Sequence, residues 1–367
     1  MRAPLPSGGT IRVPLHSPKV IGVSVSRGVR SYQEDGHNVS CIFIDPEELQ
    51  VGLKQSHGIE WNLNKIYKDV ANQVVFVGIY DGHGGSTVSD HLRKELHSLF
   101  ESVDKSQIPE VYDWVKSLGG YFKRYKGGAL AQWVTDDHYG TPPLDLEARA
   151  TLAFLQADRQ ISLLKESSKQ GSTASVALFH TLDNPPKPFY TAESISLTVA
   201  HCGDTRILLC PTDGGCAHAM TEDHHAEARG ESARLRRLGG TGIITDSFGE
   251  TSLGDSRFKP FGVTPEPEVR KKLLKGVEWA FSVSVSDGIT SVLSDDEIVD
   301  LARNSPDPQQ AASSILSFAE ELGSEDNATV IVVPLAGWDK PRGPDKTKEL
   351  REYRRRQAVG SERQRRM

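Results

Sequence analysis

The sequence has only four cysteines among 367 residues, and they are widely separated: Cys41, Cys202, Cys210 and Cys216. Because no CxxC pair occurs, the spacing offers no disulfide framework and favours a reducing compartment. The chain also lacks any run of about 18 apolar residues, so we expect no transmembrane segment. The remaining composition, 37% hydrophobic and 25% charged, is typical of a globular protein with an ample core.

Acidic residues are absent before Glu34, whereas basic residues occur there at five positions: Arg2, Arg12, Lys19, Arg27 and Arg30. Acid-poor leaders that contain Arg and Ser resemble mitochondrial presequences. Four prolines in this stretch, however, interrupt any amphipathic helix. We therefore predict a flexible leader over residues 1–20, either a targeting remnant or a simple lead-in to the first strand.

Charge is unevenly distributed along the chain. Residues 340–367 contain 11 Lys/Arg and 4 Asp/Glu, a net of +7, so the rest of the chain carries −13 of the total of −6. An acidic body argues against nucleic acid as a partner and suits a site for cations. For residues 337–367 we predict a basic tail or short surface helix, with an acidic partner or an anionic membrane surface as the alternative reading.

The stretch Val74–Tyr80 is apolar and rich in β-branched and aromatic residues, which predicts a buried strand. It runs directly into Asp81-Gly82-His83-Gly84-Gly85. A carboxylate beside a glycine carbonyl suits a hard divalent cation, and a histidine two residues later can transfer a proton. The alternative is an ordinary junction between a strand and a turn.

Further acidic residues lie at the ends of predicted strands, far apart in the sequence: Glu34, Asp35, Asp287 and Asp326. Asp204 lies at the tip of a predicted hairpin between strands 195–202 and 207–210. If the strand ends converge, these carboxylates repel one another unless divalent cations neutralise them. Since no Cys/His cluster accompanies them, Mg²⁺ or Mn²⁺ is favoured over zinc.

Amphipathic periodicity predicts helices over residues 86–103 and 144–166. A capping box at Ser294 predicts a helix to about Arg303, and another helix is expected over 308–322. A short helix is predicted to end near Leu238. Residues 45–72 and 104–143 are predicted to be insertions, the first polar and the second irregular.

The ordered motifs resemble the metal-dependent Ser/Thr protein phosphatases of type 2C, the PPM family. The resemblance is carried by a series that spans residues 30 to 327: Arg30-x3-Glu34-Asp35, Asp81-Gly-His-Gly-Gly, Gly171-Ser-Thr-Ala, Cys202-Gly-Asp-Thr-Arg206, Thr221-x-Asp-His, Leu253-Gly-Asp255, Pro265-Glu-Pro-Glu-Val269, Ser286-Asp-Gly288 and Asp326-Asn327. Because the residues expected to bind metal come from both ends of this span, we expect one domain over residues 21–336.

The resemblance implies an α+β fold: a β-sandwich of two antiparallel sheets flanked by antiparallel α-helices, in four αββα layers. It also implies a protein serine/threonine phosphatase that uses two Mg²⁺ or Mn²⁺ ions. A metal-bridging hydroxide would attack the phosphoryl group of a phosphoserine or phosphothreonine protein. The expected partners are thus phosphoprotein substrates, and the expected state is a monomer.

The resemblance further assigns roles to individual residues. Asp81 would bridge two ions, Asp287 and Asp326 would bind one, and Glu34 with the Gly82 carbonyl would bind the other. The remaining assignments each concern one residue: Asp35 orients a metal-bound water, Asp204 binds a weak third ion, Arg30 binds phosphate and His83 protonates the leaving alkoxide.

The sequence departs from the family pattern at two positions. Ser291 stands where the family often has another Asp, which predicts a weak third ion. Thr251 stands where the family usually has Arg, so the geometry of the neighbouring flap is not expected to follow the family. The metal set argues for catalysis, whereas the alternatives are an inactive phosphatase-like regulatory protein or an enzyme for small phosphate esters.

The two insertions resemble those of mitochondrial members, including a fungal relative. Together with the acid-poor leader, they favour a mitochondrial location over a cytoplasmic one.

Overall fold

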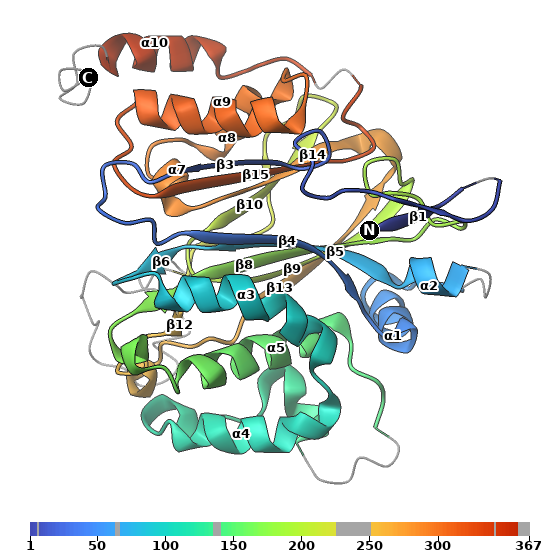
Figure 1. The fold of residues 1–367 in the computed structure, drawn as a ribbon, viewed down its shortest axis with the longest axis vertical. Helices are drawn as coiled ribbons and strands as arrows, with labels where there is room; N and C mark the ends of the chain where they lie inside the picture. The colour runs from blue at the N-terminus through green and yellow to red at the C-terminus, as the bar shows by residue number, and fades with distance from the viewer. Residues whose placement is uncertain (6, 63–66, 135–140, 225–250, 341–342, 359–367) are drawn as a thin grey trace.

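The computed structural model describes residues 1–367 except 6, 63–66, 135–140, 225–250, 341–342 and 359–367. Two five-stranded antiparallel sheets stack face to face at the centre of the molecule (Figure 1). The first sheet has the order β11 (His218–Ala219), β10 (Arg206–Pro211), β14 (Trp279–Val285), β15 (Ala328–Pro334) and β3 (Gly22–Ser26). The second has the order β13 (Glu268–Lys275), β9 (Ser194–Cys202), β8 (Ala174–Thr181), β5 (Gln73–Tyr80) and β4 (Gly36–Phe43). The predicted sandwich is therefore confirmed.

Alternating side chains explain why β5 and β15 are almost continuously apolar. In β5, Val75 and Val77 enter the core between the sheets, whereas Phe76 points to the outer cluster beneath the helices. In β15, Ile331 faces the inter-sheet core and Val330 faces the opposite side. Since both faces of each sheet are covered, these strands bury both of their faces, so the period-2 alternation of polar residues disappears.

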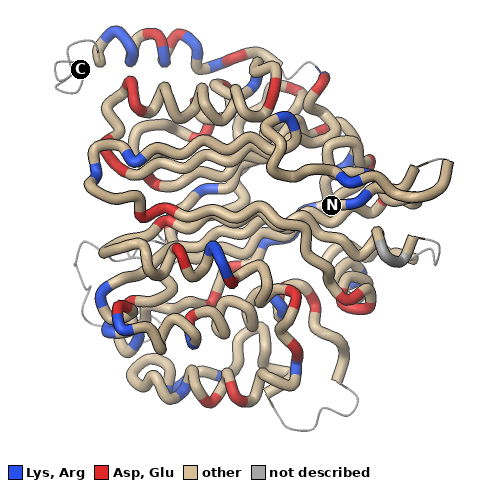
Figure 2. Tube along the Cα trace, viewed as in Figure 1, with Lys and Arg blue, Asp and Glu red and all other residues tan. Residues whose placement is uncertain are grey.

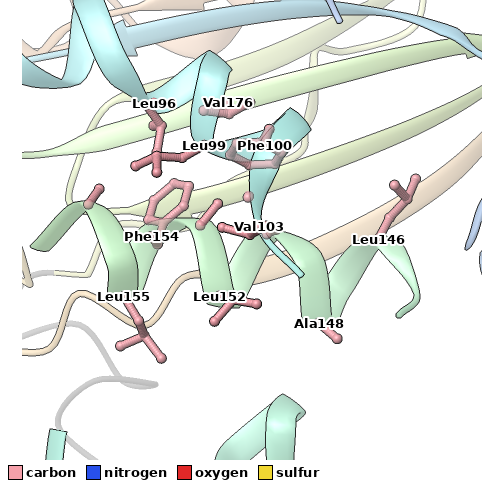
Figure 3. Close-up of a cluster of buried hydrophobic side chains, with 14 of the residues drawn as sticks. Leu96, Leu99, Phe100, Val103, Leu146, Ala148, Leu152, Phe154, Leu155 and Val176 are labelled. Atoms are coloured by element: carbon pink, nitrogen blue, oxygen red, sulfur yellow. The ribbon is translucent and has the colours of Figure 1, made fainter. Parts of the chain in front are cut away.

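Helices cover the outer face of each sheet (Figure 1). α3 (Thr87–Ser102) and α5 (Leu146–Ile161) lie over the second sheet, and Phe100 of α3 meets Phe154 of α5 edge-on with ring centroids 6.2 Å apart (Figure 3). α8 (Asp295–Arg303) and α9 (Pro308–Glu321) cover the first sheet. The capping box at Ser294 is present, because its hydroxyl accepts the Glu297 N–H and Glu297 accepts the Ser294 N–H.

The predicted hairpin around Asp204 is wrong. β9 and β10 belong to different sheets: β9 pairs with β8 and β13, while β10 pairs with β14 and β11. Gly203 is in the left-handed region with φ of 119°, and the chain crosses there from one sheet to the other. Two adjacent apolar strands with a short glycine turn look the same in sequence whether they pair or cross.

The two predicted insertions contain helices that periodicity did not reveal. Residues 46–57 form α1 and residues 68–71 form α2, and the Arg149 guanidinium of α5 makes two hydrogen bonds to the buried Glu48 carboxylate of α1 at 2.5 and 2.8 Å. Residues 104–143 are not simply irregular, because α4 (Ile108–Ser117) packs beside α5. Short 3₁₀ segments complete this region: Lys105–Gln107, Gly120–Arg124 and Gly128–Trp133.

Both ends of the chain contain regular structure, and the short surface helix predicted within residues 337–367 is present as α10. β1 (Arg2–Pro4) and β2 (Thr10–Arg12) form a hairpin, and the Arg2 backbone exchanges two hydrogen bonds with the Gln73 amide. At the other end, α10 (Lys348–Ala358) lies over α8 and α9, where Arg354 pairs with Glu297 at 2.7 Å and Arg355 pairs with Glu321 at 2.7 Å (Figure 1). Arg354 and Arg355 of α10 thus bind acidic residues of the helices beneath it.

A small three-stranded sheet lies at one edge of the sandwich. It has the order β12 (Leu253–Gly254), β7 (Gly171–Ser172) and β6 (Gly82–His83). Acidic segments gather between the two large sheets near this edge (Figure 2). Within the described part of the chain, no helix is both long and apolar enough to cross a membrane.

The predicted short helix near Leu238 lies outside the described residues. The described residues also form these short elements: α7 (Asp287–Thr290), and the 3₁₀ segments Lys165–Ser168, Lys259–Phe261 and Gly276–Glu278.

Candidate active site

Strand pairing brings the separated acidic residues to one edge. Gly36 of β4 lies opposite Tyr80 of β5, so Asp35 and Asp81 leave the second sheet side by side. In the first sheet, Val285 of β14 pairs with Val330 of β15, so residues 286–287 and 326–329 adjoin. Because the two sheets are stacked, these two edges lie next to each other, and residues more than 200 positions apart in the sequence come into contact there.

Asp35 is fixed by the first sheet although it belongs to the second. Its Oδ2 accepts hydrogen bonds from the Ser286 hydroxyl at 2.9 Å and the Thr329 hydroxyl at 2.7 Å. Its Oδ1 is buried and has no hydrogen-bond partner among the described residues. Burial, together with repulsion from Asp287 and Asp326, raises the Asp35 pKa to about 6. A buried carboxylate oxygen of this kind calls for a cation or a proton.

Asp81 and Asp287 are in direct contact. The Asp287 backbone N–H donates to Asp81 Oδ2 at 3.2 Å. Burial raises the pKa of Asp81 well above its usual range, and repulsion from Asp35, Asp287 and Asp204 adds to the effect. Burial also raises the Asp287 pKa. The charged forms of these acids are thus destabilised until positive charge arrives.

Glu34 and Gly82 meet through their backbones. A Cβ atom at Gly82 would lie 2.4 Å from the Glu34 carbonyl oxygen, so only glycine allows this approach. The Ser89 hydroxyl on α3 donates to the same Glu34 carbonyl. The Gly82 and Glu34 positions that the sequence assigned to one ion are therefore adjacent.

Arg30 reaches the acidic group from the loop before Glu34. Its guanidinium Nη2 lies 2.6 Å from Asp326 Oδ2, and this hydrogen bond raises the Arg30 pKa above its usual value. The Arg30 side chain is 56% exposed, so a phosphate group from solvent can reach it. The positive charge beside Asp326 in this structure is therefore the Arg30 guanidinium.

Asn327 shapes the loop that carries Arg30. Its side-chain Nδ2 donates to the backbone carbonyls of Arg27 at 2.9 Å and Tyr32 at 3.0 Å. Its Oδ1 accepts the Glu34 N–H at 2.6 Å. Asn327 is buried, and it ties the Arg30 loop to the start of β15.

His83 lies on β6 and pairs with an acid that sequence reasoning gave no role. Its Nε2 is 2.6 Å from Asp255 Oδ2. Asp255 follows β12, which reaches β6 through the central strand β7. Although Leu253-Gly-Asp255 was recognised as a motif, nothing in its spacing indicated that it meets His83.

The two sequence departures have structural counterparts. Ser291 has no carboxylate to offer an ion near Asp204. Its hydroxyl instead donates to the Gly288 carbonyl at 3.4 Å. Thr251 is buried, and its hydroxyl lies 3.1 Å from His224 Nδ1. A threonine therefore serves a local hydrogen-bond network here.

The donor set fits hard divalent cations, because it consists of carboxylate and carbonyl oxygens with raised carboxylate pKa values. No three Asp, Glu, His or Cys side chains converge on a single point in the described residues. The reason lies in the pairwise contacts: Asp326 is bound to Arg30, and Asp35 is bound to Ser286 and Thr329. Side-chain rotation would be needed to gather these oxygens around an ion.

Sequence reasoning missed the residues that support the site. Ser286 and Thr329 hold Asp35, Asn327 holds the Arg30 loop, and Asp255 contacts His83. Ser286, Asn327 and Asp255 belong to motifs that the sequence analysis recognised. Membership of a motif was therefore the one sequence signal that could have indicated a supporting role for them. Thr329 carried no such signal, because it is one residue of an apolar strand.

Comparisons with known proteins agree with this geometry. The protein phosphatase 2C family pattern matches residues 47–328. Protein phosphatase 2C homolog 4 of Schizosaccharomyces pombe is 35% identical over 301 residues, which cover 77% of each chain. A Xenopus laevis protein named "Protein phosphatase 1K, mitochondrial" is 27% identical, and the alignment covers 81% of this chain and 69% of the relative.

A solved structure shares the fold. The serine-threonine phosphatase 2C of Toxoplasma gondii has a TM-score of 0.56 at 17% identity, and the match covers 91% of this chain and 98% of that one. Because the matched pattern spans most of the chain and the sandwich brings the acidic motifs to one edge, the chain belongs to the protein phosphatase 2C family, the metal-dependent protein serine/threonine phosphatases.

Proposed function

We propose that this phosphatase binds two divalent cations, Mg²⁺ or Mn²⁺, through Asp81, Asp287, Asp326, Glu34 and the Gly82 carbonyl. The observation that carries the proposal is the meeting of acidic residues from both sheets at one edge: the Asp287 N–H donates to Asp81 Oδ2 at 3.2 Å, and Asp35 is held there by Ser286 and Thr329. Such ions would supply Lewis acidity that lowers the pKa of bound water near neutral pH. Asp35, held by Ser286 and Thr329, orients water at the site through its remaining oxygen.

Arg30 and His83 act on the substrate in this proposal. The planar, exposed guanidinium of Arg30 would bind two phosphoryl oxygens once it is no longer paired with Asp326, which in turn would be a ligand of a bound cation. His83 gives a proton to the leaving serine or threonine oxygen, because such an alkoxide is too basic to depart unprotonated. The proposed reaction needs no intermediate in which a residue of the enzyme carries the phosphoryl group.

The third-ion position is proposed to be weak. Asp204 is close enough to Asp81 for its charge to raise the pKa of that carboxyl, so it lies near the proposed two-ion site. Ser291 contributes a hydroxyl bound to Gly288 where a second carboxylate would strengthen the site. Crystals soaked in Mn²⁺ are expected to show two full sites and a weak or absent one near Asp204. A fully occupied third site at modest Mn²⁺ would contradict this expectation.

The defining experiment is hydrolysis of a phosphothreonine peptide by the full chain with Mn²⁺, with Mg²⁺ and with excess EDTA. We expect activity with either ion and none after chelation, because the ligands are all hard oxygen donors. Persistent activity after thorough chelation would reject the metal-dependent reading. Hydrolysis of small phosphate esters with no turnover of phosphopeptides would favour a small-molecule substrate instead.

We further propose a monomer that acts in mitochondria, with its catalytic domain over residues 21–336. The location is supported by the acid-poor first 33 residues and by the Xenopus relative whose name includes "mitochondrial". Imaging of the full chain with a C-terminal tag tests it, and a diffuse cytoplasmic signal would contradict it. Size-exclusion chromatography with light scattering tests the monomer.

A further inference from the structure

The His83–Asp255 pair is built into the fold by three short strands. β7 lies between β6 and β12, with Gly171 paired to His83 on one side and to Gly254 on the other. A Cβ atom at Gly171 would lie 2.1 Å from Asp255 Oδ2 and 2.5 Å from His83 Nε2. The missing side chain at Gly171 therefore makes the space in which the imidazole and the carboxylate meet.

The backbone at Asp255 is held in an uncommon conformation. Asp255 is a non-glycine residue with a positive φ, 45°, a region that Asp and Asn tolerate better than most side chains. Its N–H donates to the Gln170 carbonyl at 3.0 Å, and the Ser252 hydroxyl donates to its Oδ2 at 2.8 Å. Conformations of this kind persist where surrounding contacts over-determine them, which is frequent at functional sites.

A buried ion pair supports the turn from below. Asp158 of α5 accepts the Gly254 N–H at 2.8 Å and pairs with Lys259 Nζ at 3.1 Å. The Lys259 ammonium also donates to the Ser252 carbonyl at 2.8 Å. Residues 252–259 are thus tied to α5 beneath the second sheet, so Asp255 is presented to His83 from a fixed position.

The contacts that the Asp255 carboxylate makes with His83 and Ser252 favour its charged form. Burial by itself would raise the Asp255 pKa, but the bonds from His83 and Ser252 and the nearby Lys259 charge outweigh it, and the pKa is lowered. An ionised carboxylate only accepts hydrogen bonds, so the His83 Nε2 must carry the proton in this contact. The pair therefore selects one tautomer and one ring orientation.

We infer that Asp255 is the positioning residue for His83 in the proposed reaction: it fixes the Nε2–H tautomer and directs proton delivery to Nδ1. As the phosphorus–oxygen bond breaks, its electron pair goes to the serine or threonine oxygen, which takes the Nδ1 proton. The ring that remains is the neutral Nε2–H tautomer, still bonded to Asp255, and solvent restores its proton. This role rests on the proposed acid function of His83.

The test compares Asp255→Asn and His83→Ala in the full chain with Mn²⁺, on a phosphothreonine peptide and on p-nitrophenyl phosphate. Asparagine keeps the size of the side chain and tolerates the positive φ. Its neutral amide, however, lacks the negative charge of the carboxylate and can donate as well as accept hydrogen bonds. We expect kcat for the peptide to fall about 10–100-fold in Asp255→Asn, part of the value of a general acid. The loss for p-nitrophenyl phosphate, whose leaving group needs no proton, should be smaller. The double variant, with both Asp255→Asn and His83→Ala, should be no slower than His83→Ala alone, because both substitutions act on the same proton transfer.

The matched control is Asp300→Asn on α8. Asp300 is equally buried and also ion-paired, but its partners are Arg303 and the 346–347 backbone, away from this edge. We expect it to lower the melting temperature without changing the ratio of the two kcat values. An equal loss on both esters in Asp255→Asn, or further slowing in the double variant, would overturn the positioning role.

A second measurement does not depend on activity. In ¹⁵N-labelled histidine spectra of the full chain, wild-type His83 should show a protonated Nε2, and Asp255→Asn should shift its tautomer balance. An unchanged His83 signal in a folded Asp255→Asn variant would also overturn the inference. If the wild type hydrolyses neither ester, the proposed function fails, whereas the spectra still decide whether the pair sets the tautomer.

Discussion

Asp81 contacts the backbone of Asp287 from the other sheet, so its carboxylate is central to the proposed ion site. We expect Asp81→Ala to abolish Mn²⁺ binding and nearly all hydrolysis of both a phosphothreonine peptide and p-nitrophenyl phosphate. Isothermal titration with Mn²⁺ and the two kinetic assays measure this. His83→Ala is the contrasting variant, since it should keep Mn²⁺ affinity near that of the wild type. Equal loss of Mn²⁺ binding in both variants would make His83 structural.

A second prediction at the residue scale concerns His224. Burial alone would lower the His224 pKa, but its bonds to Cys202 and Glu268 raise it to about 9, and the partly exposed Glu268 has a pKa lowered to about 2. The His224 charge therefore stabilises the fold below pH 6.5, and its contribution is lost as the pH rises through about 9. The Glu268 contribution is present above pH 4.5 and is lost as the pH falls through about 2.

The measurement is the melting temperature of the wild type minus that of His224→Gln, from pH 5 to 10. We expect the difference to be largest between pH 5 and 6.5 and to shrink towards pH 10. The neighbouring His201, whose ring centroid is 4.6 Å from that of His224, remains neutral across this range because burial lowers its pKa to about 3. A difference that stays constant with pH would show that His224 is not charged in the folded protein.

At the scale of elements, the buried Glu48–Arg149 pair joins α1 to α5. The exposed fractions of the two side chains are 11% and 6%, and Arg149 also donates to the Phe100 carbonyl on α3 at 2.7 Å. Glu48→Ala leaves the guanidinium buried without its carboxylate, which costs about 3–5 kcal/mol for pairs of this kind. Urea unfolding measures the loss, and Arg93→Ala is the control, since its pair with Asp90 is exposed. A loss under about 1 kcal/mol for Glu48→Ala would mean that α1 is not anchored by this pair.

At the scale of the whole molecule, the raised carboxylate pKa values predict that metal binding stabilises the fold. Cations bound at the edge where the sheets meet would relieve the repulsion among Asp35, Asp81 and Asp287. An ion at about 100 times its Kd would add about 2.7 kcal/mol to the free energy of unfolding. We expect Mn²⁺ to raise the melting temperature of the wild type and EDTA to reverse the change, with no effect in Asp81→Ala. An equal Mn²⁺ shift in Asp81→Ala would place the stabilising ion elsewhere.

The sequence by itself determined the strands whose faces are both buried and the acids at their ends. Val74–Tyr80 and Ala328–Pro334 are apolar because helices and the opposite sheet cover them, and Asp81 and Asp326 adjoin those runs. α3, α8 and α9 were predictable too, since one-sided packing leaves a helical period and caps such as Ser294. These signals are local, so no tertiary information is needed to detect them.

Only the tertiary structure decided which of these elements meet. Whether β9 and β10 pair or cross between sheets depends on the strands beside them, and the short Gly203 turn permits both. α1 and α10 are held by ion pairs to distant helices, and such contacts leave no periodic pattern. His83 and Asp255 are 172 residues apart, and their contact exists because Gly171 lies between their strands without a side chain. A contact of that range is set by sheet order and backbone spacing, which no short stretch of sequence encodes.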